Sequence, residues 1–259
     1  MSNLEITQLL DEAVAFYHQG KIVPAIEKIE NIVALDASYY PAYNLLGCVF
    51  FSQGMFEEAE EYFLHSQKLN PDHAEVYNNL GYIYLQTQKF DQAENLFNKA
   101  LAISPNDTET LNNLALQYKY LSKHDKAIEY FKKIININPN LPEVFNNLGC
   151  IYKETGLLED AITNFNKALE IDNTDIESLN NLACTYKALD MKQKAIELFE
   201  KAIKLSPDDE TLRYNLGISF AEIGENKKAV KQFESYLKTS TAPAHSVQVK
   251  NWIQKLKKN

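Results

Sequence analysis

Small and apolar residues recur along the chain with a strict period of 34 residues. When each repeat is numbered 1 to 34, position 20 is alanine in every repeat, position 8 is glycine or alanine, and position 11 is aromatic. Position 24 is phenylalanine in six repeats and Ile29 in the first. Seven repeats follow one another without insertion or deletion: 6–39, 40–73, 74–107, 108–141, 142–175, 176–209 and 210–243.

The pattern within one repeat predicts two antiparallel helices joined by a short turn. Positions 4, 7, 8 and 11 lie on one face of the first helix at about 100° per residue. Glycine at position 15, as at Gly54 and Gly156, ends that helix because the left-handed cap is easiest for glycine. Proline at position 32, as at Pro71, ends the second helix.

Packing between repeats follows from the same positions. The small residue at position 8 and the alanine at position 20 let two helix axes approach closely, and the aromatic side chains at positions 11 and 24 fill the surrounding space. One hairpin cannot bury its own apolar face, so neighbouring repeats must stack into a solenoid. Residues 244–259 predict an amphipathic capping helix, in which we expect Trp252 to cover the last repeat rather than to bind a ligand. Its apolar residues are Val247, Val249, Trp252, Ile253 and Leu256.

The small, aromatic, alanine and proline positions resemble those of the tetratricopeptide repeat (TPR) family, and the resemblance covers residues 6–243. It implies an all-α, right-handed α-solenoid of seven helix-turn-helix TPR units plus the C-terminal capping helix. We therefore expect residues 1–259 to form a single TPR solenoid. In this family the first helices line the concave side, so the resemblance implies a binding groove there.

The first helix of each repeat has a second face, made of positions 2, 5, 6, 9, 12 and 13, which we call the first-helix face. Asparagine dominates two of these positions although it is a poor helix former. Position 6 holds Asn79, Asn113, Asn147, Asn181 and Asn215, and position 5 holds Asn78, Asn112, Asn146 and Asn180 in addition to Asn44. An amide both donates and accepts hydrogen bonds, so these side chains are candidates to hold the backbone of an extended peptide.

A similar position-6 asparagine ladder occurs in the TPR superhelix of O-linked N-acetylglucosamine transferase, although this chain has no glycosyltransferase domain. First helices spaced about 10 Å apart would give five rungs that hold a segment of roughly twelve residues. Duplication of one ancestral repeat would copy the asparagines whether or not they bind a partner, and the sequence leaves both explanations open.

Charged residues on the first-helix face also repeat. Position 12 gives Lys119, Lys153 and Lys187, and position 2 gives four glutamates, Glu75, Glu109, Glu143 and Glu177. These residues predict an acidic edge and a basic edge that orient a peptide. An ordinary solvated surface explains the same pattern.

Composition limits the partners. The net charge is −9, and the part before the last sixteen residues carries −13, so the surface repels nucleic acid and anionic lipid. No apolar run is long enough to span a bilayer, and the N-terminus lacks a secretory signal pattern. The three cysteines, Cys48, Cys150 and Cys184, fit reduced thiols in a cytoplasmic protein.

Catalytic and metal-binding patterns are not found in the sequence. The five histidines have no metal-ligand spacing, and every glycine is used at repeat position 8 or 15 rather than in a phosphate-binding loop. We therefore expect no enzyme activity, cofactor or metal. The predicted function is a protein–protein interaction scaffold that binds an extended or disordered segment in its groove. The alternatives are a self-assembling structural subunit, which would form homo-oligomers, and, with less support, an RNA-binding protein.

Overall fold

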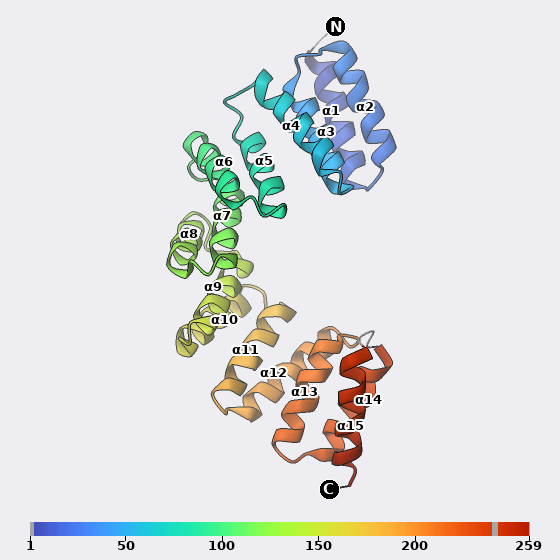
Figure 1. Ribbon diagram of the computed structural model, residues 1–259, viewed down its shortest axis with the longest axis vertical. Helices are drawn as coiled ribbons and strands as arrows, with labels where there is room; N and C mark the ends of the chain where they lie inside the picture. Colours follow the sequence, from blue (N-terminus) through green and yellow to red (C-terminus); the bar gives the residue numbers. More distant parts are fainter. Residues whose placement is uncertain (1–2, 240–242, 259) are drawn as a thin grey trace. The chain divides into compact units, whose positions relative to one another are not determined.

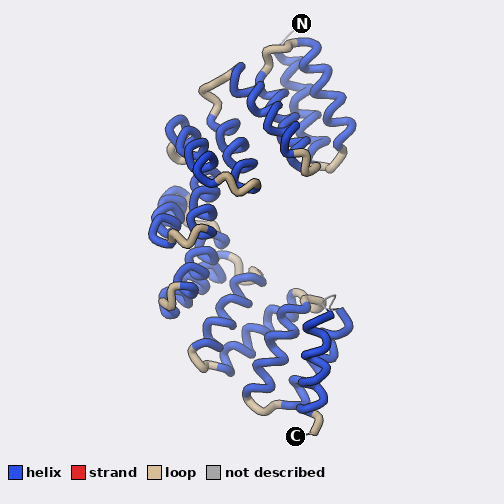
Figure 2. Tube along the Cα trace, viewed as in Figure 1, coloured by secondary structure: helices blue, strands red, loops and turns tan. Residues whose placement is uncertain are grey.

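The computed structural model describes residues 3–239 and 243–258, and every regular element within them is an α-helix (Figure 2). Within the described residues, fourteen helices form seven consecutive pairs, one for each 34-residue repeat, and a fifteenth follows the last pair (Figure 1). The first helices are α1 (Asn3–His18), α3 (Tyr40–Ser52), α5 (Ala74–Gln86), α7 (Thr108–Tyr120), α9 (Pro142–Glu154), α11 (Ile176–Ala188) and α13 (Glu210–Glu222). The second helices are α2 (Ile22–Leu35), α4 (Phe56–Leu69), α6 (Phe90–Ile103), α8 (His124–Ile137), α10 (Leu158–Ile171), α12 (Lys192–Leu205) and α14 (Asn226–Thr239).

The helices divide into two compact units, Met1–Ile137 and Asn138–Asn259, which we call the N-terminal unit and the C-terminal unit. Within each unit, every first helix packs on the second helix of its own repeat, and each second helix packs on the first helix of the next repeat. The predicted all-α solenoid is confirmed. No helix in the described part of the chain is both long and apolar enough to cross a membrane.

The turn inside every repeat has the same backbone geometry. Position 15 has a positive φ in all seven repeats, whether it is a glycine, as at Gly156 (79°), or another residue, as at Gln88 (59°) and Ser122 (54°). The amide at position 16 donates to the carbonyl at position 11 each time, as from Lys89 to Tyr84 at 2.7 Å. This pair of features is the Schellman motif, which satisfies carbonyl groups at the end of the first helix.

The core of each repeat follows the predicted contact between positions 8, 20 and 24. The alanines at position 20 are fully buried, and the position-24 side chains are at most 2% exposed. Glycine at position 8 leaves room for the phenylalanine ring of the same repeat, since a Cβ on Gly81 would lie 2.7 Å from a ring carbon of Phe97. The helix pair therefore packs closely because one side chain is missing where the ring lies.

The capping helix is α15 (Pro243–Leu256), which packs against α14. Val249 is fully buried and Ile253 is 8% exposed, as expected for the covering face of an amphipathic helix. Val247, by contrast, is 61% exposed and does not belong to that face. The end of the predicted cap, residue 259, lies outside the described residues.

Candidate functional site

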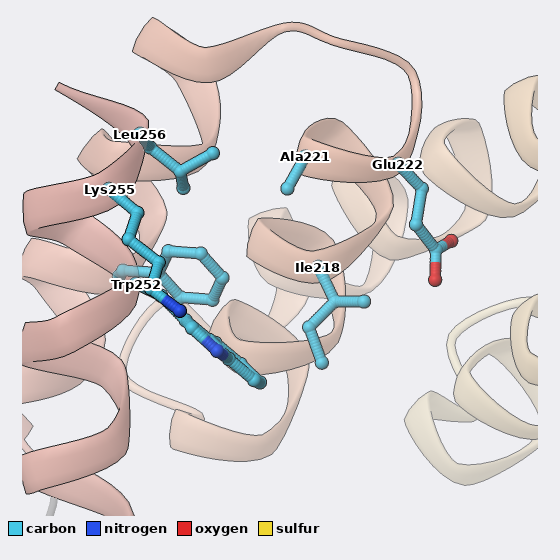
Figure 3. Close-up of a pocket in the computed structure, with 7 residues that line it drawn as sticks. Ile218, Ala221, Glu222, Trp252, Lys255 and Leu256 are labelled. Carbon is cyan, nitrogen blue, oxygen red and sulfur yellow. The ribbon is translucent and has the colours of Figure 1, made fainter. Parts of the chain in front are cut away.

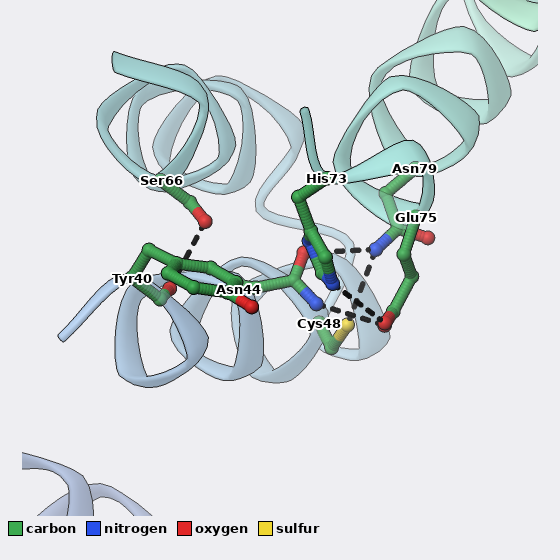
Figure 4. Close-up of polar contacts among 7 residues, drawn as sticks. All are labelled: Tyr40, Asn44, Cys48, Ser66, His73, Glu75 and Asn79. Carbon is green, nitrogen blue, oxygen red and sulfur yellow. Dashed lines mark hydrogen bonds and ion pairs between the residues drawn. The ribbon is translucent and has the colours of Figure 1, made fainter. Parts of the chain in front are cut away.

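A polar joint on the first-helix face connects the first helices of neighbouring repeats (Figure 4). The Asn79 side chain of α5 donates from Nδ2 to Asn44 Oδ1 of α3 at 3.1 Å, and it also lies 3.8 Å from Cys48 Sγ. Asn44 Nδ2 in turn donates to Glu75 Oε1 at 2.8 Å. Each joint thus connects two adjacent repeats. The position-6 asparagine of the later repeat donates to the position-5 asparagine of the earlier repeat, which in turn donates to the position-2 glutamate of the later repeat.

The same joint recurs in both units. The further Nδ2-to-Oδ1 bonds run from Asn113 to Asn78 at 2.9 Å, from Asn181 to Asn146 at 3.1 Å, and from Asn215 to Asn180 at 3.1 Å. In the N-terminal unit, Asn78 Nδ2 also donates to Glu109 Oε1 at 3.0 Å. The paired asparagines therefore satisfy one another between stacked helices, a structural role that the sequence interpretation did not include.

Burial separates the predicted peptide-binding asparagines into two groups. Three are buried between neighbouring helices: Asn78 (3% exposed), Asn113 (6%) and Asn146 (4%). The others are half-buried: Asn79, Asn112, Asn147, Asn180, Asn181 and Asn215. The expectation of a solvent-facing position is wrong for the buried three, because a helical wheel describes one helix and omits its neighbour.

Two half-buried asparagines at position 6 keep a free acceptor. Among the described residues, no donor reaches Oδ1 of Asn79 or Asn215, whose Nδ2 atoms are used in the joint. The Oδ1 of Asn181 differs, because Lys153 Nζ donates to it at 3.2 Å. Asn79 and Asn215 are therefore position-6 side chains with an acceptor left to offer a partner backbone.

The lysines at position 12 lie half-buried on the first-helix face. Lys187 pairs with Glu222 at 3.4 Å, and Lys153 is hydrogen-bonded to the joint. The acidic edge is likewise engaged, since Glu75 and Glu109 accept from position-5 asparagines. Residues of both the predicted acidic edge and the predicted basic edge are thus partly engaged in contacts within the protein itself.

Net charge differs strongly between the units. The N-terminal unit has 18 acidic residues against 10 lysines, whereas the C-terminal unit has 17 acidic residues against 16 lysines and arginines. Nearly all of the net charge of −9 therefore belongs to the N-terminal unit.

Two pockets lie on the first-helix face of the N-terminal unit. A pocket of about 200 Å³ is lined by Tyr17, Cys48, Phe51, Phe63, Asn79, Tyr82 and Glu109. A pocket of about 340 Å³ is lined by Tyr82, Leu85, Gln86, Gln88, Phe90, Leu116 and Tyr120. Because Tyr82 lines both, we treat them as one surface, the aromatic groove, across α1, α3, α5 and α7.

Several residues of the aromatic groove were not singled out from the sequence. Position 12 is apolar in the first three repeats, at Tyr17, Phe51 and Leu85, is lysine in the fourth to sixth repeats, and is alanine in the seventh. Tyr120 at position 13 is 66% exposed although its ring contacts Phe90, with centroids 5.4 Å apart. The change at position 12 between the third and fourth repeats was the signal in the sequence that separates the aromatic groove from the lysine-bearing repeats.

The cysteines at position 9 are half-buried on the first-helix face. None of the three forms a disulfide. Burial, together with the carboxylates of Glu75 and Glu109, raises the pKa of Cys48 to about 12, and burial raises the pKa of Cys184. Within the described residues there is no cluster of histidine, cysteine and acidic side chains suited to a metal ion.

Paired helices of constant length, a repeated joint and a lined groove define a helical-repeat scaffold of the kind that generally binds other proteins. Family models described as tetratricopeptide repeat match residues 40–106, 72–140, 107–174, 146–208 and 181–244. The chain belongs to the tetratricopeptide repeat family. Its fold is generally a non-catalytic scaffold.

Solved structures are similar to this chain over most of its length. A tetratricopeptide repeat protein from Parabacteroides merdae is 19% identical with a TM-score of 0.68, covering 99% of this chain and 100% of that one. YrrB, a TPR protein with an unusual peptide-binding site, is 22% identical with a TM-score of 0.57, covering 73% and 96%. MamA is 25% identical with a TM-score of 0.58, covering 65% and 92%. No curated protein sequence matched the chain.

Proposed function

We propose that the protein is an interaction scaffold that binds an extended segment of a partner protein on its first-helix face. The observation that carries the proposal is the aromatic groove, because apolar pockets with a few polar groups are the usual form of a recognition site. Its aromatic side chains supply a large contact area, and Asn79 supplies an acceptor at the groove wall.

The asparagines take different parts in this proposal. The half-buried position-6 amides contact the peptide backbone in each unit separately, Asn79 in the N-terminal unit and Asn147, Asn181 and Asn215 in the C-terminal unit. Asn78, Asn113 and Asn146 hold neighbouring helices together. The half-buried position-5 residues Asn112 and Asn180 contribute to the binding faces of the N-terminal unit and the C-terminal unit, respectively. Lys119, Lys153 and Lys187 border the segment where the face becomes basic. The peptide-binding site described for YrrB supports peptide recognition as a use of this fold.

The N-terminal unit favours a segment with bulky apolar side chains and basic neighbours. Tyr82 lies between the two pockets, so successive apolar side chains can occupy both. An acidic surface steers a basic segment toward the groove and speeds its association.

Selection from a displayed library of random twelve-residue peptides tests the proposal. Peptides enriched on the wild-type protein are measured by fluorescence anisotropy against the wild type and against Tyr120→Ala. We expect at least a tenfold loss of affinity in the variant, because truncation of an aromatic side chain that anchors a partner costs about 2 kcal/mol or more. Val23→Ala is the control, because Val23 is also 66% exposed but lies on the second helix α2.

Two results would count against the proposal. Selected peptides whose affinity is the same for wild type and Tyr120→Ala would show that binding occurs elsewhere. Self-association that rises with concentration in light scattering, with no peptide enriched, would favour the self-assembling subunit instead.

A further inference from the structure

An apolar pocket lies between α13 and the capping helix α15 (Figure 3). Its residues belong to the C-terminal part of the sequence, whereas those of the aromatic groove belong to the N-terminal part. Its volume is about 320 Å³, within the range of small ligand sites. The lining residues are Ile218, Ala221, Glu222, Phe233, Trp252, Lys255 and Leu256, and we call this surface the cap pocket. Figure 3 shows Ile218 and Ala221 on one helix facing Trp252 and Leu256 on the other.

The walls of the cap pocket are held rigidly by the core beneath them. The Trp252 ring stacks on Tyr214, with centroids 6.0 Å apart and planes at 28°, and its centroid lies 5.7 Å from that of Phe233. Val249 and Ile253 fix α15 by their burial. A side chain entering the pocket therefore meets a surface already ordered, so little conformational entropy is lost on binding.

Charges at the rim are unequal. Glu222 is neutralised by Lys187, whose Nζ lies 3.4 Å from its carboxylate. Lys255 has neither a hydrogen bond nor an ion pair among the described residues, and α15 contains no acidic residue. The rim thus presents one uncompensated ammonium group beside an almost wholly carbon-lined pocket.

The structure assigns this pocket to a partner segment that carries a bulky apolar side chain next to an acidic residue. The apolar side chain occupies the cap pocket, and the carboxylate pairs with Lys255. The inference rests on the proposed protein-binding function, but it names a second anchor with partner chemistry unlike that of the aromatic groove. Trp252 thereby both caps the last repeat and forms a wall of the pocket.

Trp252 also reports on its own pocket, because it is the single tryptophan of the chain. The probe is a capped hexapeptide with one phenylalanine followed by two glutamates, which does not fluoresce when tryptophan is excited selectively. We expect a saturable change in tryptophan emission. The same peptide with lysines in place of the glutamates should bind at least fivefold more weakly.

Two variants test the two parts of the assignment. Ala221→Leu fills the pocket with a good helix former and should abolish the saturable signal. Ala188→Leu is its control, since Ala188 is exposed at the end of α11 and does not line the pocket. Lys255→Gln should leave the pocket intact and remove the preference for the acidic peptide. Circular dichroism verifies that each variant keeps its helical content.

Either of two results would overturn the assignment: no saturable emission change in the folded wild type, or equal affinity for the acidic and basic peptides. Failure here is distinguishable from failure of the proposed function. If library-selected peptides still depend on Tyr120, the protein binds segments but the cap pocket is not an anchor. If only the hexapeptide binds, the cap pocket is used and the aromatic groove is not.

Discussion

Replacing Asn78 with alanine tests whether the asparagine joint stabilises the stack of repeats. Asn78 is 3% exposed, accepts from Asn113 at 2.9 Å and donates to Glu109 at 3.0 Å. The substitution removes both hydrogen bonds and leaves the buried Nδ2 of Asn113 without its acceptor. This mutation therefore separates a structural role for position 5 from a role in peptide binding alone.

The expected loss can be worked out from these contacts. The unsatisfied donor of Asn113 costs about 1–2 kcal/mol, and the bond to the exposed Glu109 carboxylate contributes about 1 kcal/mol. Alanine has a better helix propensity than asparagine, which offsets the loss by about 0.5 kcal/mol. The net result is a decrease of about 2 kcal/mol in the free energy of unfolding.

Urea unfolding followed by circular dichroism measures this decrease, fitted with nearest-neighbour coupling because stacked repeats unfold in steps. Asn98→Ala is the matched control, since Asn98 is exposed in the interior of α6. We expect the control to be unchanged or more stable by about 0.5 kcal/mol. If the two variants differ by less than about 0.5 kcal/mol, the joint does not stabilise the stack.

Two further predictions concern the turn and the thiols. Gln88→Gly should raise the free energy of unfolding by about 0.5–1 kcal/mol, because Gln88 has φ 59° and glycine adopts this conformation without steric cost. Lys99→Gly, at an exposed position in the interior of α6, should instead lower the free energy of unfolding by about 0.5–1 kcal/mol in the same urea titration. The pKa of Cys48, raised to about 12, keeps the protonated thiol dominant from pH 7 to 9. Iodoacetamide at pH 8 should therefore modify Cys48 about a thousandfold more slowly in the folded protein than in the urea-unfolded protein. Peptide mass spectrometry measures both rates, and equal rates would refute the burial of this thiol.

The repeat core was predictable because its determinants lie within one hairpin. Gly81 and Phe97 are sixteen residues apart in the same repeat, and their spacing recurs at Gly149 and Phe165. Helical periodicity and residue size were therefore enough to place them against each other. The left-handed turn was predicted only at its glycines, because Gln88 and Ser122 adopt that conformation without the residue type that signals it.

The site was less predictable because its contacts join different repeats. The sequence indicated a special role for Asn78 and Asn113, but the partner of each side chain is 35 residues away. Helix propensity registers that asparagine is unfavourable and does not reveal which neighbour compensates for it. The aromatic groove was missed for a related reason, since Phe51 and Tyr82 become neighbours only after stacking, with ring centroids 5.4 Å apart.

The asparagine joint has a consequence for how the gene can change length. In each of its asparagine–asparagine bonds the donor comes from the following repeat and the acceptor from the preceding one, as in Asn79 to Asn44 and Asn113 to Asn78. Deletion of residues 74–107 would therefore bring Asn113 opposite Asn44 and restore the same type of bond. Unequal recombination can therefore add or remove whole repeats while the contact between adjacent first helices stays the same. After such a change, selection needs to act on the groove-lining residues and not on this contact.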